Sequence, residues 1–499
     1  MWIMLCWLIA ILVVLSASFI FDRSLFGKRQ VPTQGPNSLT HDAITTILSD
    51  MGHSGFDAVC YGFTLNWAAA VAEGNEGVFY KQLHLLRAHQ SNLPTIVKQV
   101  EAKTRDNKLL TRNERVIKKI PVLLRKICMA QEPLDYKKQY GKLVWQSDIP
   151  SILRKITAKL SRVRRIFYKT HTFDSKTEAN TYFNLLKNTG INGCTAVIIS
   201  TDDHAMGFKL TGKLWRFMEI NELFEQHIKK PYYEFTSEQL VNKLYELCIS
   251  GTTQNRLTVN TDFIAKQSCD SLPKWLNNVY PIFPCKSKIT YADKISFFSM
   301  AALQGDIEAV QKCLKSGWSI FFHDQLSDNS PLVTALTKGR RAVVQAMVSS
   351  PHYLINKKRK SDGFTLLHLA CKYSGPEIVG DLLKIKGIRV DSQDRKGRTP
   401  LMIACKATIF TKEQRLFEQL CAHGASLTIK DAAGLTALDH AIQNNHQLAV
   451  KMIQNEMALR TRPASGSKKR SNNAAFFYKK AHKSISDDNT YLCLANNLA

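Results

Sequence analysis

The sequence predicts an α+β domain followed by an all-α solenoid of helical repeats, and three observations support this fold class. Short apolar helical segments recur at a regular interval from residue 297 onward. Residues 41–285 instead mix helical and β-branched strand patterns without a repeat. The chain has 499 residues, of which 44% are hydrophobic, so it can form more than one buried core.

The repeats are marked by alanines that recur every 34 to 37 residues, each in a segment where closely stacked helices require a small side chain: Ala301, Ala335, Ala370, Ala404 and Ala441. Three of them end the turn motifs DGFTLLHLA (362–370), KGRTPLMIA (396–404) and AGLTALDHA (433–441). The threonine of each motif can cap the helix that follows. These motifs resemble the D-G-x-T-P-L-H-x-A signature of ankyrin repeats, which implies about five units over residues 293–455.

The resemblance to ankyrin repeats implies a protein partner bound by hairpin tips and the concave face. The expected partner-binding residues belong to two successive hairpins: Lys357, Lys358, Arg359 and Lys360 in one, and Asp394, Arg395 and Lys396 in the next. The basic run at 357–360 also fits a nuclear-import signal or an ordinary charged tip.

The chain carries 68 Lys and Arg against 41 Asp and Glu, a net charge of +27 that favours acidic partners. Residues 98–170 hold 20 of these basic residues and six acidic ones, in segments that read as helices, NERVIKKIPVLLRKI and SILRKITAKLSRVRRIFYK. Two interpretations stay open for this basic helical insertion. It is either a solvated face over a core, or a docking surface for an anionic membrane or nucleic acid.

Residues 1–21 carry no charge and reach the length of a membrane span, and the basic residues that follow predict a cytoplasmic remainder. A cleaved signal peptide and a start site further downstream are the alternatives. Residues 22–40 read as a linker, and the basic tail 460–499 as disordered. The 12 cysteines are scattered singly, which indicates a reducing compartment, and none has zinc-binding spacing, which predicts no structural metal. No cofactor motif appears.

Three segments of the first domain combine into a candidate nucleophilic site. Cys60 begins an apolar run that ends at Gly74 and predicts a buried helix, whose N-terminus favours a thiolate. His204 enters a strand that we expect to form a hairpin with residues 214–221 around a loop at Gly212-Lys213. This register places His204 opposite Asn221 and diagonal to Glu219, the arrangement of a cysteine, histidine and acid in nucleophilic catalysis.

The motif Cys60-x-Gly62-x-x-x-x-Trp67, the pair His204-Ala205 and the segment Glu219-Ile220-Asn221 resemble YopT/AvrPphB-type cysteine proteases, a papain-like clan of bacterial effectors. The resemblance implies a papain-like fold, with Cys60 as nucleophile, His204 as general base, and Glu219 with Asn221 in the third segment. Joined to ankyrin repeats, the plan is similar to Legionella ankyrin effectors that carry a protease-like domain. It implies virulence, with delivery into the cytoplasm or nucleus of a host cell.

This chain departs from the family in two ways. Glu219 replaces an aspartate, and residues 41–59 contain no Asn or Gln to donate a hydrogen bond to the reaction's oxyanion. The Cys60 N–H, helped by His53 or Ser54, remains for that role. Two functions therefore stay open, a host-directed thiol hydrolase and a catalytically inactive ankyrin scaffold, with deamidation and acyl transfer as variants of the first.

Overall fold

A computed structural model describes the chain in segments, which form two compact units. The first unit contains the described residues up to 347, and the second contains those from 348 onward. The described residues are 39–53, 55–56, 58–141, 143–146, 148–159, 161–189, 191, 193–201, 204–223, 230–249, 256–266, 291–321, 330–349, 355–407 and 414–461.

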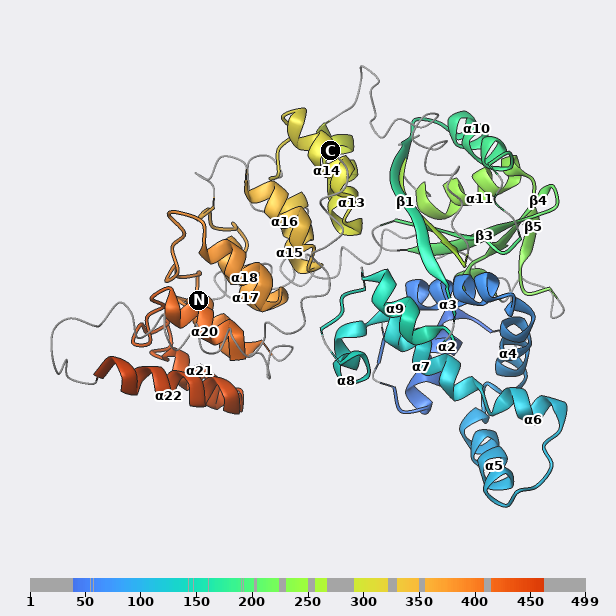
Figure 1. Cartoon of the computed structure of the whole chain (residues 1–499), viewed down its shortest axis with the longest axis horizontal. Helices are drawn as coiled ribbons and strands as arrows, with labels where there is room; N and C mark the ends of the chain where they lie inside the picture. The colour runs from blue at the N-terminus through green and yellow to red at the C-terminus, as the bar shows by residue number, and fades with distance from the viewer. Residues whose placement is uncertain are drawn as a thin grey trace, which may run out of the picture. The chain divides into compact units, whose positions relative to one another are not determined.

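The first unit is built around a six-stranded antiparallel sheet in the order β1-β6-β2-β3-β4-β5 (Figure 1). The alternation of strand side chains divides the core into two layers. In β2, Ala196 and Ile198 face the layer that contains α3, whereas Val197 and Ile199 face the layer formed with α10 and α11. The bounds are β1 Arg164–Phe173, β2 Ala196–Ser200, β3 Ala205–Thr211, β4 Leu214–Met218, β5 Tyr233–Phe235, β6 Leu257–Ala265, α10 Lys176–Leu186 and α11 Ser237–Ile249.

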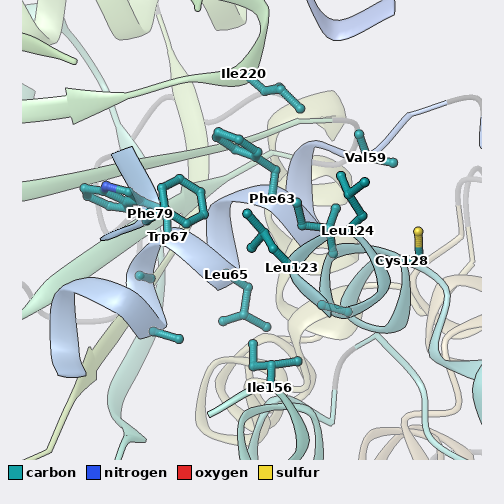
Figure 2. Close-up of a cluster of buried hydrophobic side chains, with 14 of the residues drawn as sticks. Val59, Phe63, Leu65, Trp67, Phe79, Leu123, Leu124, Cys128, Ile156 and Ile220 are labelled. Atoms are coloured by element: carbon teal, nitrogen blue, oxygen red, sulfur yellow. The ribbon is translucent and has the colours of Figure 1, made fainter. Parts of the chain in front are cut away.

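Helix α3, Cys60–Glu73, is the central helix of this unit and has the predicted bounds. It is apolar on nearly all sides, as expected for a helix enclosed by other elements. Phe63 and Trp67 are fully buried in the cluster that Figure 2 shows. Gly74 ends the helix in the left-handed conformation, with φ of 76°, which glycine adopts without a steric penalty.

Gly207 in β3 allows the sheet to approach this helix, because a Cβ at this position would overlap the indole ring of Trp67. We expect Gly207→Ala to lower the free energy of unfolding by about 1–3 kcal/mol, the usual cost of overpacking a core. Urea denaturation would measure this change. Gly77→Ala is the control, because a Cβ there meets no atom within 4 Å. Equal stability of the two variants would contradict this account of the helix–sheet contact.

The basic segment 98–170 is helical in large part, and part of it belongs to the core. Its helix α7 packs against α3 and buries Ile120, Leu124 and Ile127 in the same core. The helices that precede and follow α3 in this layer are α2 His41–Asp50, α4 Glu76–His89, α5 Leu93–Arg105, α6 Arg112–Ile117, α7 Ile120–Gln131, α8 Lys137–Tyr140 and α9 Ile149–Ile156, with a short 3₁₀ helix at Pro133–Tyr136. This arrangement favours the interpretation of a solvated basic face over a core.

The helix predicted for SILRKITAKLSRVRRIFYK is wrong beyond Ile156. From Arg164 this stretch is strand β1, which pairs with β6 from Arg164↔Ala265 to Phe173↔Leu257. The run IFYKTHTF is rich in aromatic and β-branched residues, which suit a strand. Pairing with a distant strand therefore outweighs the helical spacing of the basic residues.

The predicted five-unit array is present as five pairs of helices. The buried alanines and the threonine caps Thr365, Thr399 and Thr436 are as expected. The pairs are α13 Tyr291–Gln304 with α14 Ile307–Lys315, α15 Pro331–Thr337 with α16 Arg341–Val348, α17 Leu366–Tyr373 with α18 Pro376–Leu383, α19 Pro400–Lys406 with α20 Gln414–Ala422, and α21 Ala437–Gln443 with α22 Gln447–Thr461.

The first two of these units belong to the compact unit that contains the sheet. Helix α13 contacts β1 and β6, and Gln304 donates a hydrogen bond to Ser200 Oγ at 3.2 Å. The Asp306 carboxylate accepts the N–H of Thr170 at 3.1 Å while it caps α14. The start of the array therefore packs against the sheet and belongs to the same compact unit.

The predicted membrane anchor, the linker up to residue 38 and the tail from residue 462 lie outside the described residues. Within the described part, no helix combines the length and apolarity needed to cross a bilayer. The described cysteines are all free thiols, and no group of His, Cys, Asp or Glu side chains there is arranged to hold a metal ion.

Candidate active site

Cys60 is the first residue of α3 and is buried, with 7% of its surface exposed. Val59 precedes it as the N-cap residue, and Gly62 lies close against α7, where a Cβ would overlap the carbonyl oxygen of Ile127. The N–H of Gly62 is held by the Gln131 side-chain oxygen at 2.9 Å. These contacts fix the first turn of α3, whose N–H groups and helix dipole favour a negative charge on Cys60.

His204 lies immediately before β3, and the hairpin it enters has the predicted register. Gly207 pairs with Met218 and Thr211 with Leu214, which leaves Gly212 and Lys213 as the two-residue loop. The backbone N–H of His204 donates to Thr201 Oγ1 at 3.1 Å, so the residue is held at the turn between β2 and β3. His204, which follows Cys60 by 144 positions in the chain, lies close enough to the thiol to lower its pKa.

Glu219 is the partner of His204. Its Oε1 lies 2.9 Å from His204 Nε2, and the side chain is fully buried. The same oxygen accepts the backbone N–H of Asn221 at 2.9 Å, because Glu219 caps the 3₁₀ helix Ile220–Glu222. Asn221 therefore contributes its backbone to the site, whereas its side chain is exposed. This corrects the expectation that the Asn221 side chain lies opposite His204, because the chain leaves the sheet after Met218.

The surroundings of Cys60 and His204 favour the charged form of each side chain. Burial by itself would raise the pKa of Cys60, but hydrogen bonds with His204 and His41 outweigh burial and lower this pKa to about 7. Burial would likewise lower the pKa of His204, but its hydrogen bonds with Cys60 and Glu219 raise it to about 10. Between these values the charged forms, a thiolate beside an imidazolium, are favoured, and a thiolate is a far stronger nucleophile than a thiol.

His41 is a residue of this site that sequence reasoning missed. It is the first residue of α2, and its proximity is one cause of the lowered pKa of the Cys60 thiol. Its Nε2 also accepts the backbone N–H of Val59 at 3.3 Å. The sequence contains no signal for this contact, since His41 stands 19 positions before Cys60 at the end of a segment that reads as a linker.

His53, one of the two side chains expected to help the Cys60 N–H, is engaged elsewhere. Its Nδ1 lies 3.1 Å from the hydroxyl of Tyr136. Ser54, the other, lies outside the described residues. A second cysteine in this region, Cys128, is unreactive by comparison, because burial raises its pKa to about 11.

The hairpin residues expected to bind a partner divide into two groups. Lys358, Lys360, Arg395 and Lys396 are exposed, and Lys357 is partly exposed. Arg359 is instead paired with Asp362 and stabilises its own hairpin.

Asp394 does not fit the prediction of a partner contact. It is only 6% exposed, and its carboxylate accepts the N–H groups of Lys396 and Arg398, both at 2.8 Å. The same side chain also pairs with the Arg398 guanidinium. Asp394 is therefore a structural residue of its hairpin, because a carboxylate that closes the turn is not available to a partner.

A comparison with known protein families identifies the repeats. The family model for ankyrin repeats (3 copies) matches residues 298–394 and 373–460. Together with the five helix pairs, this match shows that the C-terminal region consists of ankyrin repeats, a class of module that binds other proteins.

Three curated proteins are similar to part of the chain. The ankyrin repeat protein FPV031 of fowlpox virus (strain NVSL) is 28% identical over 173 residues, 34% of this chain and 49% of that protein. The transient receptor potential cation channel subfamily A member 1 of Drosophila melanogaster is 31% identical over 147 residues, 29% of this chain and 12% of the channel. The zinc finger CCCH domain-containing protein 24 of Oryza sativa subsp. japonica is 28% identical over 119 residues, 23% of this chain and 14% of that protein. The chain thus spans half or less of each relative.

Proposed function

We propose that this protein is a thiol hydrolase of the papain-like, YopT/AvrPphB type, a protease whose ankyrin repeats recruit the protein substrate. The observation that carries the proposal is the meeting of Cys60, His204 and buried Glu219 from three separate elements. Structural cysteines have no need of a histidine that is itself held by a buried carboxylate. As an effector-type protein it would act on host proteins inside a host cell.

The proposed reaction follows from the charges of the site. The Cys60 thiolate attacks the carbonyl carbon of a peptide bond, a C–S bond forms, and the carbonyl π electrons move onto oxygen. When this intermediate collapses, the C=O bond re-forms, the C–N bond breaks, and the His204 imidazolium gives its proton to the leaving amine. Neutral His204 then takes a proton from water, which attacks the thioester carbon. Cleavage of the C–S bond releases the acid and restores the thiolate–imidazolium pair.

Glu219 would keep His204 oriented during both proton transfers. Its Oε1 lies 2.9 Å from Nε2, so Nδ1 is the ring nitrogen that would exchange protons with the thiol. The burial of Glu219 keeps water from competing for this contact. The third member of the site therefore positions the base and does not itself exchange protons.

The binding half of the proposal rests on the hairpin tips of the array. Lys358, Lys360 and Lys396 are exposed, whereas the nearby acids Asp362 and Asp394 are used inside the hairpins. Because these carboxylates accept hydrogen bonds within the turns, the exposed surface of the hairpin tips has a net positive charge. The substrate or adaptor that it fits is a host protein with an acidic segment.

Selective alkylation of Cys60 tests the proposal. We expect iodoacetamide at limiting concentration and neutral pH to modify Cys60 of the full chain well before Cys194, although Cys194 is exposed and Cys60 is buried. The reason is that a thiolate reacts and a thiol does not. Peptide mass spectrometry measures the extent at each cysteine, with Cys60→Ser and Cys194→Ser as matched controls.

The alternative function is a catalytically inactive scaffold that binds and sequesters host protein complexes. It is favoured by one observation, that residues 298–460 match the family model for ankyrin repeats, a class of module that binds other proteins. Modification of Cys60 no faster than Cys194 would support the scaffold and contradict the hydrolase. Deamidation and acyl transfer would use the same thiolate, so the product formed from a peptide distinguishes them from proteolysis.

A further inference from the structure

A cysteine hydrolase needs hydrogen-bond donors for the oxygen that becomes negative when sulfur attacks a carbonyl carbon. The N–H of Cys60 can supply one donor, because it lies in the first turn of α3, where such groups lack an intrahelical acceptor. Residues 41–59 contain no Asn or Gln that could supply a second donor. A side-chain amide from another element nevertheless reaches this end of α3, and it belongs to Gln131.

Gln131 is the last residue of α7, and its backbone is held in place by two contacts. The first is the close approach of α7 to α3, which Gly62 permits because a Cβ there would overlap the carbonyl oxygen of Ile127. The second is a hydrogen bond from Gln146 Nε2 to the backbone carbonyl oxygen of Gln131, at 3.0 Å. The backbone that carries the amide is therefore fixed relative to the start of α3.

The orientation of the Gln131 amide follows from its contact with Gly62. Its Oε1 accepts the Gly62 N–H at 2.9 Å. A backbone N–H can only donate, so the amide oxygen must face it and Nε2 must face elsewhere. Within the described part of the chain Nε2 makes no hydrogen bond, and the side chain is partly exposed. The two N–H groups of Nε2 are therefore available to a bound molecule.

Helix geometry places this amide at the level of Cys60 along the axis of α3. The free N–H groups of a first turn point toward the N-terminal end of the helix. Gly62 follows Cys60 by two residues, which span about 3 Å along the axis. An oxygen 2.9 Å from the Gly62 nitrogen in that direction lies level with the Cys60 nitrogen. Nε2 lies about 2.2 Å from this oxygen, since both atoms are bonded to one carbon. The Cys60 N–H and the Gln131 amide are therefore two donors at the helix end that carries the thiol.

We propose that Gln131 is a catalytic residue whose Nε2 donates a hydrogen bond to the oxyanion formed when Cys60 attacks a carbonyl. This inference rests on the proposed function and deepens it. On attack, the sulfur electron pair becomes the C–S bond and the carbonyl π pair becomes the negative charge on oxygen. That oxygen lies before the first turn of α3, between the Cys60 N–H and the Gln131 amide. Because Oε1 stays bound to Gly62, the amide does not need to reorganise during the reaction, which is what makes an oxyanion donor effective.

Two reagents with different transition states test the role. p-Nitrophenyl acetate transfers its acetyl group to sulfur through a tetrahedral oxyanion, and the leaving p-nitrophenolate needs no proton. Iodoacetamide alkylates the same sulfur by displacement of iodide, without an oxyanion. We expect Gln131→Ala in the full chain to slow the Cys60-dependent p-nitrophenolate burst by about 10²–10³-fold, and the alkylation rate by less than about tenfold.

Gln131→Glu separates the acceptor from the donor of this side chain. A carboxylate can still accept the Gly62 N–H but has no N–H to donate. Its negative charge also opposes the thiolate, so the quantity compared is the ratio of the acylation rate to the alkylation rate. We expect this ratio to fall at least as far as in Gln131→Ala, while the melting temperature stays close to that of the native protein. The same variant decides the question if Gln131→Ala does not fold.

The matched control is Gln139→Ala, because Gln139 is an exposed glutamine of the short helix α8. It should leave both rates within about twofold of the native protein. The burst of Cys60→Ser is subtracted as background, and the melting temperature of each variant establishes that it is folded.

The outcomes separate this inference from the proposed function. A native ratio of the two rates in Gln131→Glu would show that the side chain serves only as an acceptor for Gly62, and would overturn the donor role while the hydrolase stands. Equal slowing of both reactions by Gln131→Ala would overturn the donor role in the same way, because it would place the effect on the thiolate. A native protein with neither a Cys60-dependent burst nor selective alkylation would overturn both the donor role and the hydrolase.

Discussion

Replacement of His204 with alanine is expected to raise the pKa of Cys60 and to slow acyl transfer to substrate by about 10³-fold or more. The variant loses the hydrogen bond that contributes most to lowering the thiol pKa, while the burial that raises it remains. It also loses the proton donor for the leaving amine. The loss at neutral pH therefore combines a smaller thiolate fraction with a missing general acid.

Alkylation and hydrolysis at Cys60 should depend on pH in different ways. The native thiol has its pKa lowered to about 7, so reactivity toward iodoacetamide should rise as pH increases through this value. The imidazolium has its pKa raised to about 10, so hydrolysis, which needs the proton on His204, should fall as pH increases through that value. Alkylation needs no such proton and should show the first limb without the second. In His204→Ala the first limb should move to higher pH.

Glu219→Gln is the comparison variant for the same experiment. The amide cannot carry the charge that helps to raise the pKa of His204. The alkaline limb of hydrolysis should therefore move to lower pH, while the folded structure is kept because the amide oxygen can still accept the N–H of Asn221. A thiol whose pH profile is the same in all three proteins would contradict the ion pair.

Replacement of Arg340 with methionine is expected to destabilise the unit that contains Cys60 by roughly 3 kcal/mol. Arg340 precedes α16 in the second repeat, and its Nε donates to the carbonyl oxygen of Leu303 at 2.6 Å. Burial lowers its pKa to about 9, and the charge of Arg165 contributes in the same direction. The compensating charge is Asp262, which is fully buried in β6.

Asp262 keeps one cation when Arg340 is removed, because Arg165 Nη1 lies 3.2 Å from its Oδ1. It also keeps the Asn260 amide, at 2.9 Å from Oδ2. The expected loss is therefore at the lower end of the range for a broken buried pair. Tyr61, the neighbour of Cys60 in α3, lies close enough to the same charges for them to affect its pKa. The second repeat is thus connected to α3, the helix that begins at Cys60.

Hydrogen exchange of the full chain measures this effect by region. In Arg340→Met, amides of residues 60–73 should exchange faster, whereas those of residues 366–383 in the second unit should keep their native rates. The exposed neighbour Arg341 is the control, and Arg341→Met should change stability by less than about 0.5 kcal/mol. Faster exchange confined to the repeats would contradict the assignment of Arg340 to the core around the sheet.

Local patterns were enough to predict several parts of this protein. The apolar run from Cys60 to Gly74 indicated a buried helix because its spacing leaves no polar face. The two residues at Gly212-Lys213 indicated the hairpin and its register, since a two-residue loop leaves one pairing that keeps the apolar faces together. The alanine and threonine spacing indicated the helix pairs. In each case the interacting residues are close in the chain, so their spacing in the sequence is enough to predict the contact.

Contacts between distant segments could be read only from the folded chain. The position of His41 at Cys60, the use of the Asn221 backbone in place of its side chain, and the strand that begins at Arg164 all depend on packing. The grouping of the first two repeats with the sheet in one compact unit is of the same kind. No periodicity marks such contacts, because they join elements whose separation along the chain is arbitrary. They form where burial of apolar surface and pairing of buried charges lower the free energy together.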